Sequence, residues 1–300
     1  MSDNAPADFV SVVIPTHNRA HYILDAVVSA LNQGPEVGEV IVVDDGSTDN
    51  TLAVLQRVSD SRLRVLRQTQ SGPVAARNQA WQQARGRWIQ FLDSDDGLET
   101  GAVPSLLAAA RKNPARIAYG IASVHAQKLE LLPHYTFCFA HRSGNILSEF
   151  CFYAGGTILS CLLPRPAIVE VGGFGGFPES ADCEDFDFGL RLALRYEFTY
   201  VSRICYKIRM HDANRHRPMH RQVWVSSMAC VERRLPSTPR YWLLKQRCKA
   251  YYKGLVADYD LANGDVAGAV RGYWQCLAWW PIKFGAWKGL SRALQRKMIR

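Results

Sequence analysis

The chain has 300 residues, of which 48% are hydrophobic and 21% charged. These proportions are ordinary for a globular protein and exclude a disordered or fibrous chain. No apolar run reaches the roughly 20 residues of a membrane-spanning helix, and the polar start MSDNAPADF predicts no signal peptide. Eight scattered cysteines, without a CxxC pair or a zinc-like spacing, indicate a reduced, cytoplasmic protein.

The net charge of +9 is unevenly distributed along the chain. Residues 1–202 carry 16 basic and 22 acidic side chains, whereas residues 203–300 carry 20 basic and 5 acidic ones. A basic segment favours an anionic partner, such as nucleic acid, anionic lipid or a phosphorylated substrate. The charge alone does not choose between them.

Strand and helix patterns alternate in the first third of the chain. Buried strands are expected at 9–14, 39–43, 63–66 and 88–92, and helices at 21–33, directly after Asn50 and at 73–84. Repeated strand–helix–strand units of this length predict an α/β fold, with a mostly parallel sheet covered by helices on both faces.

Polar clusters follow three of these strands, at 15–18 (PTHN), 44–47 (DDGS) and 93–96 (DSDD). Ligands of open parallel sheets bind beyond the carboxyl ends of the strands. The three clusters therefore predict a binding site at one edge of the sheet.

From about residue 216 onward only helical patterns remain. We therefore predict a main domain over 8–215 and a basic, tryptophan-rich helical extension over 216–300. Two amphipathic stretches within 241–275, joined by an Asn-Gly-Asp turn at 263–265, resemble one tetratricopeptide-type hairpin. One such repeat cannot bury its own apolar face and must pack on another surface.

Four tryptophans lie within the last 27 residues, among many basic side chains: Trp274, Trp279, Trp280 and Trp287. Aromatic and basic residues at helical spacing suit a helix that lies on an anionic membrane surface. Alternatively, the tryptophans pack the extension against the rest of the protein. The sequence leaves both possibilities open.

The segment 93–96 carries the strongest chemical signal. Asp93 and Asp95 directly follow a strand, and two such carboxylates can share a hard divalent cation that also holds a diphosphate. Capping a helix would need only one Asp, and three carboxylates in four residues repel one another without a cation. We therefore expect a cation site here.

The turn at 44–47 is more ambiguous, because Asp and Ser also cap helices. This turn is expected to lie beside the acidic segment 93–96, with Arg77 nearby on a helix that follows the flexible 71–73 segment. The arrangement suits a ligand with polar groups and phosphate. Arg77 is alternatively an ordinary ion-pair partner.

A third acidic cluster, Glu184-Asp185-x-Asp187, precedes a helix on which Arg191 and Arg195 are expected to face solvent. Such a cluster either complements the helix N-terminus or supplies a general base that takes a proton from an incoming hydroxyl. The glycine-rich segment 172–177 ahead of it is a loop that can close over a substrate.

His211 follows the strand-like segment 205–210. It could ligate a metal or contact a diphosphate, although a lone histidine is more often a surface residue or one with its hydrogen bonds satisfied.

Five segments together resemble the family 2 glycosyltransferases of the GT-A fold: VSVVIPTHNRAHYILDAVVSALNQ, VIVVDDGSTDNT, GPVAARNQA, WIQFLDSDD and GGFGGFPESADCEDFDFGLRL. They follow the family's order and usual intervals, and they cover about residues 9–215. The resemblance implies a Rossmann-like GT-A domain and an inverting transferase. Its donor is a nucleotide-diphosphate sugar, with a UDP-sugar favoured, and its acceptor is a carbohydrate or lipid-linked hydroxyl.

The resemblance also assigns roles by position in the motifs. Asp45 contacts the base and Asp93 the ribose. Asp95 matches a ligand of Mg²⁺ or Mn²⁺, with His211 as the second candidate ligand, and Asp185 matches the catalytic base. The full set of residues expected at the nucleotide is Pro15, Thr16, Asn18, Asp45, Arg77 and Asp93.

The QxxRW motif is absent, so we expect that the resemblance does not extend to processive synthases of cellulose or hyaluronan type. We also expect the enzyme to transfer one sugar per reaction. Bacterial surface-polysaccharide or lipopolysaccharide assembly is expected, in the cytoplasm or peripherally on the inner face of the plasma membrane, without a nucleic-acid partner. Two alternatives remain. One is a non-catalytic nucleotide-binding or interaction module on a transferase-like core. The other is a haloacid-dehalogenase-type phosphatase, because LDSDDG resembles the nucleophile loop of that family.

Overall fold

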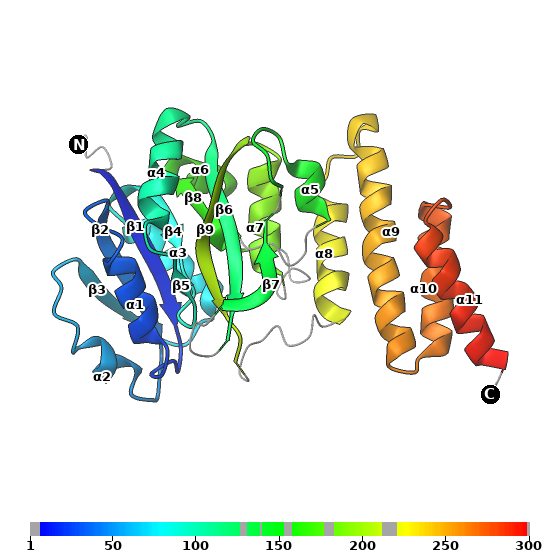
Figure 1. The fold of residues 1–300 in the computed structure, drawn as a ribbon, viewed down its shortest axis with the longest axis horizontal. Coiled ribbons are helices and arrows are strands. Elements are labelled where there is room, and N and C mark those ends of the chain that lie inside the picture. The colour runs from blue at the N-terminus through cyan, green and yellow to red at the C-terminus, as the bar shows by residue number, and fades with distance from the viewer. Residues whose placement is uncertain are drawn as a thin grey trace. The chain divides into compact units, whose positions relative to one another are not determined.

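The computed structural model describes residues 7–126, 131–138, 140–152, 158–176, 183–211 and 221–298 (Figure 1). The chain divides into two compact units. The first comprises Met1–Ile146, Gly156–Gly175 and Arg195–Asn214, and the second comprises Leu147–Gly155, Gly176–Leu194 and Arg215–Arg300. The expected domain boundary at 215/216 falls outside the described residues and stays a prediction.

The first unit is built on a mixed sheet in which nine described strands take part, in the order β3-β2-β1-β4-β8-β6-β9-β5, with β7 beside β6. The strands are β1 (Ala7–Thr16), β2 (Val37–Asp45), β3 (Leu63–Gln68), β4 (Gly86–Phe91), β5 (Gly97–Leu98), β6 (Ile117–His125), β7 (Leu131–Phe137), β8 (Cys161–Pro164) and β9 (Phe198–Arg209). The four strands predicted from the sequence, β1 to β4, pair in parallel. Beyond β4 the sheet is mixed: β8 runs antiparallel to both β4 and β6, β6 and β9 pair in parallel, and β5 runs antiparallel to β9.

Helices cover both faces of this sheet, which explains why the central segments 12–14 of β1 and 40–43 of β2 are apolar and buried without alternation. Gln33, just after α1 (Ile23–Leu31), accepts a hydrogen bond from the amide of Val103 in α4 (Ala102–Lys112). Asn78 of α3 (Pro73–Gln83) exchanges two hydrogen bonds with Phe174, which follows α6 (Arg165–Val171). The chain reverses direction across the sheet after β3, so right-handed crossovers place α1 and α3 on opposite faces.

The second unit consists of helices: α5 (Leu147–Cys151), α7 (Glu184–Ala193), α8 (Arg221–Arg234), α9 (Pro239–Ala262), α10 (Val266–Trp279) and α11 (Phe284–Met298). The expectation that Arg191 faces solvent is wrong, because this side chain is buried in α7. Its Nε donates to Oδ2 of Asp187 at 2.9 Å, and Arg234 of α8 donates to Oδ1 of the same carboxylate at 2.7 Å. The buried negative charge of Asp187 compensates the buried arginine.

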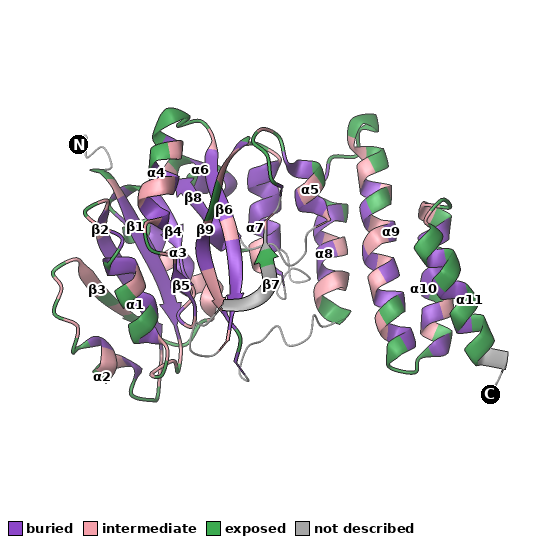
Figure 2. Cartoon of the chain, in the orientation of Figure 1, coloured by how far each residue is buried: buried purple, intermediate pink, exposed green. Residues whose placement is uncertain are grey.

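The helical hairpin expected in the extension is present. Helices α9 and α10 are joined at Asn263-Gly264-Asp265, where Gly264 adopts a φ of 85° and Asp265 caps α10 by accepting from the amide of Gly268. The hairpin buries its apolar side against α11, chiefly Tyr273 with Leu290 and its neighbours (Figure 2). Across the part of the chain that the structure describes, no helix is both long and apolar enough to span a bilayer.

Candidate functional site

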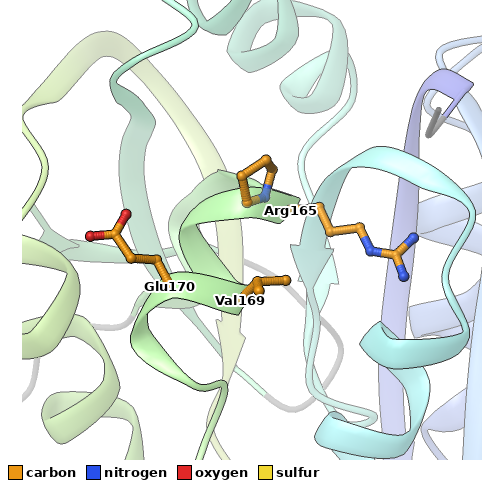
Figure 3. Close-up of a pocket in the computed structure, with 4 residues that line it drawn as sticks. Arg165, Val169 and Glu170 are labelled. Atoms are coloured by element: carbon orange, nitrogen blue, oxygen red, sulfur yellow. The ribbon is translucent and has the colours of Figure 1, made fainter.

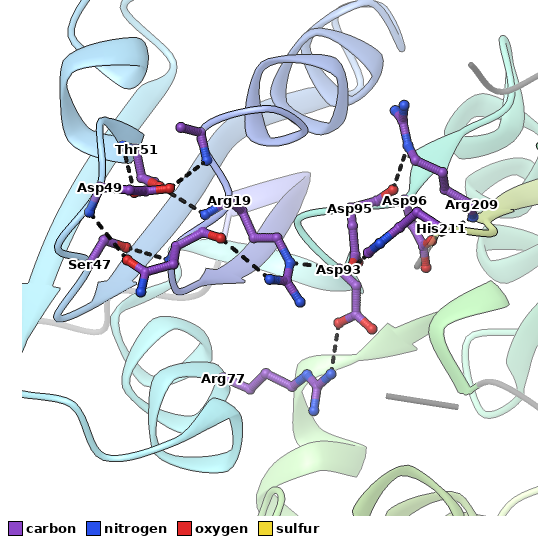
Figure 4. Close-up of polar contacts among 12 residues, drawn as sticks. Arg19, Ser47, Asp49, Thr51, Arg77, Asp93, Asp95, Asp96, Arg209 and His211 are labelled. Carbon is purple, nitrogen blue, oxygen red and sulfur yellow. Dashed lines mark hydrogen bonds and ion pairs between the residues drawn. The ribbon is translucent and has the colours of Figure 1, made fainter. Parts of the chain in front are cut away.

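Three loops converge where β1, β2 and β4 end, as the polar clusters of the sequence predicted (Figure 4). The loop after β1 is hydrogen-bonded to the loop after β2 through Asn18, and it reaches the loop after β4 through Arg19. Helix α3 approaches the same place through Arg77. Parallel strands end at one edge, so the register of the sheet produces this convergence.

Asn18 fastens the first two loops together. Its backbone has a φ of 52°, in the left-handed region, where asparagine is among the few residues tolerated. Its Oδ1 accepts from the backbone amides of Thr48, at 2.8 Å, and Asp49, at 3.3 Å. The backbone amide of Asn18 donates to Oγ of Ser47. The side chain predicted to line the nucleotide pocket therefore also shapes the loop that forms it.

Asp45, at the end of β2, organises the segment before α3. Its Oδ1 accepts from Nε2 of Gln68 and from the amide of Ser71, both at 2.7 Å, and its Oδ2 accepts from the amide of Gly72 at 2.8 Å. Burial by itself raises the pKa of this carboxyl, but the three hydrogen bonds outweigh it and lower the pKa below its usual value. Asp45 is therefore ionised and pre-oriented.

Pro15 and Thr16 end strand β1 and are held in the ladder opposite Val43 and Asp44. The Thr16 side chain is buried, and its hydroxyl has no hydrogen-bond partner among the described residues. A buried hydroxyl without a partner costs free energy. It is therefore suited to meet a polar group of a ligand at this edge.

Asp93 pairs with Arg77 across the site. A terminal nitrogen of Arg77 donates to Oδ1 of Asp93 at 2.7 Å, and the guanidinium lies 5.1 Å from the centre of the Phe174 ring. The Arg77 side chain is buried, whereas Asp93 remains partly open to solvent. Arg77 therefore forms an ion pair, which was one of the two alternatives for this residue. Its partner, Asp93, is itself a predicted site residue.

Asp95 is contacted from two sides. Nε of Arg19 lies 3.3 Å and Nε2 of His211 lies 3.1 Å from the same atom, Oδ2 of Asp95. His211 is buried and stacks on Tyr22 with ring centres 4.5 Å apart, so it is no surface histidine. The two predicted metal ligands, Asp95 and His211, are therefore brought together.

Asp96 has a structural task that separates it from its neighbours. Its carboxylate is buried and accepts from the hydroxyl of Tyr206 at 2.9 Å and from the amide of Arg209 at 2.8 Å. Burial, with the charges of Asp95 and Asp93, raises its pKa well above the usual value. Both of its oxygens hold the turn against β9.

A divalent cation fits this donor set. One carboxylate oxygen from each of Asp93, Asp95 and Asp96 lies within 4.8 Å of the others. Hard cations such as Mg²⁺ and Mn²⁺ prefer such oxygen ligands. Because Asp96 is engaged with β9, the partly open Asp93 and Asp95 are the side chains suited to a cation and its diphosphate.

Sequence reasoning missed several residues that build this site. Arg209 of β9 donates through Nε to the backbone oxygen of Asp95 and through a terminal nitrogen to Asp25 of α1, and its guanidinium lies over the ring of Tyr22. Arg19 follows the PTHN cluster directly, so its position was a usable signal. Nothing local marks Tyr206 or Arg209, which lie more than 100 residues from the carboxylates that they hold.

Asp185, the predicted catalytic base, lies in the first turn of α7 in the second unit and is partly buried. Its neighbour Asp187 forms ion pairs with Arg191 and Arg234. The role of Asp185 stays a prediction. Of the glycine-rich segment 172–177, residue 177 lies outside the described residues, and closure of this segment over a substrate stays a prediction.

A shallow pocket of about 390 Å³ lies on α6 of the first unit, lined by Arg165, Pro166, Val169 and Glu170 (Figure 3). It contains none of the candidate site residues. Its polar rim consists of one arginine and one glutamate, so it offers no set of converging ligands.

The chain is similar to known glycosyltransferases in sequence and in fold. Residues 11–159 match Glycosyl transferase family 2. Chondroitin synthase of Escherichia coli is 33% identical over 215 residues, which cover 68% of this chain and 29% of that protein. Hyaluronan synthase of Pasteurella multocida is 32% identical over 209 residues, covering 68% of this chain and 21% of that protein.

Among solved structures, residues 1–349 of S. aureus TarS in complex with UDP-GlcNAc superimpose with a TM-score of 0.69 at 18% identity, covering 90% of this chain and 81% of that one. The GT-A fold and the C-terminal helices are thereby confirmed. The chain belongs to family 2 of the glycosyltransferases. It spans less than a third of the length of the two curated synthases. The match to a hyaluronan synthase corrects the expectation that the resemblance excludes such enzymes.

Proposed function

We propose that this chain transfers a sugar, with inversion, from a nucleoside-diphosphate sugar to a hydroxyl group of a carbohydrate or lipid-linked acceptor, in the assembly of a surface polysaccharide. The observation that carries the proposal is that the aspartates of the turn at 93–96 have different roles. Asp96 anchors the turn to β9, while Asp93 and Asp95 remain partly open at the edge where three loops meet. The sugar-polymer synthases among the relatives support the polysaccharide context.

We propose that Asp95 and His211 would hold Mg²⁺ or Mn²⁺. Asp93 would be a further ligand. A bound divalent cation would neutralise the negative charge that develops on the leaving diphosphate. Arg19 contacts the same oxygen of Asp95 as His211 and therefore keeps that carboxylate oriented before the donor arrives. The buried Arg77 in turn fixes Asp93 on the ribose side.

Asp45 supports a choice of base. An ionised carboxylate offers about four acceptor positions, and three donors already use three of them. One acceptor position is left on Oδ2, which suits a base that presents a single ring N–H. Uracil and thymine present one such donor, whereas the guanine edge presents more. This supports a UDP-sugar or dTDP-sugar over a GDP-sugar, and the UDP complex of TarS is consistent with the choice.

Asp185 is the proposed general base. It would take the proton of the acceptor hydroxyl as this oxygen attacks the anomeric carbon and the bond to the diphosphate breaks. A single displacement of this kind inverts the anomeric configuration. Glu184, one residue earlier on the same helix turn, provides a matched control.

The proposal is tested by incubating the full chain with UDP-, dTDP- and GDP-sugars and Mn²⁺, and following release of the nucleoside diphosphate by NMR. We expect slow, metal-dependent release from a UDP- or dTDP-sugar, with water as acceptor and a sugar product of inverted configuration. Asp185→Asn should lower the rate by about 10²-fold or more, and Glu184→Gln much less. Release with retained configuration, or an equal loss in both variants, would contradict the assignment of the base.

A further inference from the structure

Helix α11 has one buried side and one exposed side (Figure 2). Its inner side is buried through Ala286, Leu290 and Ala293. Large apolar side chains nevertheless remain on the outer side: Phe284 is 79% exposed and Trp287 47% exposed, and Leu294 is also exposed. At about 100° per residue these three side chains fall within an arc of about 80°. A packed helix normally has no such second apolar stripe.

The stripe continues onto the neighbouring helix and connection. Trp274 of α10 is 53% exposed and meets Trp287 edge to face, with ring centres 6.1 Å apart. Ile282, in the connection between α10 and α11, is 67% exposed. We call these five side chains (Trp274, Ile282, Phe284, Trp287 and Leu294) the aromatic face. Exposed apolar side chains gathered in this way mark an interaction surface.

The two other tryptophans of this region have a different role. Trp279 and Trp280 are only partly exposed and pack against the helical core. Cations of α9 cover their rings, with Lys249 over Trp279 at 4.6 Å and Arg247 over Trp280 at 5.6 Å. The packing alternative from the sequence thus holds for this pair, whereas Trp274 and Trp287 face outward.

The charge of this region restricts the partner. Residues 266–298 contain six basic residues and no acidic one. Two of these cations, Lys288 and Arg292, are exposed on α11 directly beside the apolar stripe, and a terminal nitrogen of Arg292 lies 3.9 Å from the exposed carboxylate of Asp258. Aromatic and aliphatic groups edged by cations match the boundary of an anionic bilayer, where apolar groups enter the acyl region and cations meet the headgroups.

We infer that the aromatic face of α10 and α11, with Lys288 and Arg292, docks on an anionic membrane surface. A second copy of this chain is disfavoured as occupant, because two faces of the same positive sign would be brought together. The inference stands on the second unit alone and does not depend on the donor site, so either can fail without the other.

The test is co-sedimentation of the full chain with vesicles of phosphatidylcholine alone, or with about 30% phosphatidylglycerol, at low and high salt. We expect binding to the anionic vesicles at low salt, weakened by high salt and nearly absent on neutral vesicles. The double variant Lys288→Gln/Arg292→Gln should bind about 25-fold more weakly, at roughly fivefold for each cation removed. The double variant Phe284→Ser/Trp287→Ser should bind at least about tenfold more weakly.

Trp242→Ser is the matched control, because Trp242 is 59% exposed but lies on α9, outside the aromatic face. It should bind vesicles like the wild type. Unchanged thermal unfolding and an unchanged circular dichroism spectrum show that the variants are folded. No binding of the wild type at low salt, equal binding to neutral vesicles, or an equal loss in the Trp242 variant would overturn the inference. So would self-association that Phe284→Ser/Trp287→Ser abolishes, if vesicle binding is absent.

Discussion

The hydroxyl group of Tyr206 links Asp93 and Asp96, because it accepts from the amide of Asp93 at 3.0 Å while it donates to Oδ2 of Asp96 at 2.9 Å. A single buried side chain on β9 thereby fixes the backbone at one end of the acidic turn and the carboxylate at the other. Burial, followed by the charges of Asp96 and Asp93, raises the pKa of Tyr206 well above its usual value, so the hydroxyl keeps its proton and remains a donor.

Tyr206→Phe should therefore cost about 1–3 kcal/mol of unfolding free energy, because the buried Asp96 loses a donor and the Asp93 amide loses its acceptor. Nucleotide affinity should fall as well, since Asp93 is no longer fixed. Urea unfolding measures the first effect. Tyr200→Phe is the control: its hydroxyl contacts His141 near the surface, and its removal should change stability by less than about 0.5 kcal/mol. Equal losses in the two variants would contradict the special role of Tyr206.

A pair of substitutions at Asn18 separates its backbone conformation from its hydrogen bonds. Asn18→Gly keeps the φ of 52° accessible but loses the acceptor for Thr48 and Asp49 and the contact of Nδ2 with Nε2 of His17. Asn18→Ala loses the acceptor and adds strain. We expect Ala to be less stable than Gly by about 1 kcal/mol, and both to bind nucleotide more weakly than the wild type. Thermal unfolding together with nucleotide titration checks this, and an alanine variant as stable as the glycine variant would refute the strain.

Glu39 makes folding sensitive to acid. It is buried in β2 and accepts from the hydroxyl of Ser11, the amide of Arg85 and the guanidinium of Arg64. Burial by itself raises its pKa, but these donors lower it below the usual 4.5. Because the pKa is lower in the folded state, the stabilisation is complete above about pH 4.5 and is lost as the pH falls further.

Urea unfolding between about pH 7 and pH 3 tests this effect. Glu39→Gln should be less stable near neutral pH by about 1–3 kcal/mol, and its stability should fall less steeply in acid. Parallel pH profiles for the two proteins would exclude Glu39 as a source of acid sensitivity.

Asp187 should be indispensable for folding of the second unit. Asp187→Asn removes the buried carboxylate that pairs with both Arg191 and Arg234, so we expect a loss of about 3–5 kcal/mol. Asp185→Asn, two residues earlier, is partly exposed and should affect stability much less. Circular dichroism melts of the two variants make the comparison. Equal stability would show that the Asp187 ion pairs are dispensable.

The sequence predicted β1 to β4 and their helices because each has a local signal. Strands buried on both faces are continuously apolar, and α1 keeps Ile23 and Val27 on one side. The strands beyond β4 were largely missed. β6 and β9 pair although some 80 residues of sequence separate them. Their stability comes from neighbours that no local pattern reveals.

The candidate site divides in the same way. The carboxylates, Asn18 and His211 follow strand ends or occupy recognisable motifs, and the structure brings those of the first unit together. Arg191 was misplaced because helical periodicity assigns charged residues to the outside. Periodicity cannot show that Asp187, one turn earlier, supplies a buried counter-charge.

The most direct test of the central claim is isothermal titration of UDP, with and without Mn²⁺, into the wild type, Asp95→Ala and Asp96→Asn. Metal-dependent binding should occur in the wild type, weaken by about tenfold or more in Asp95→Ala and persist in Asp96→Asn, because Asp95 is a proposed cation ligand whereas Asp96 holds the turn against β9. Binding that ignores Mn²⁺, or that survives in Asp95→Ala, would contradict a metal-dependent donor site at the end of β4.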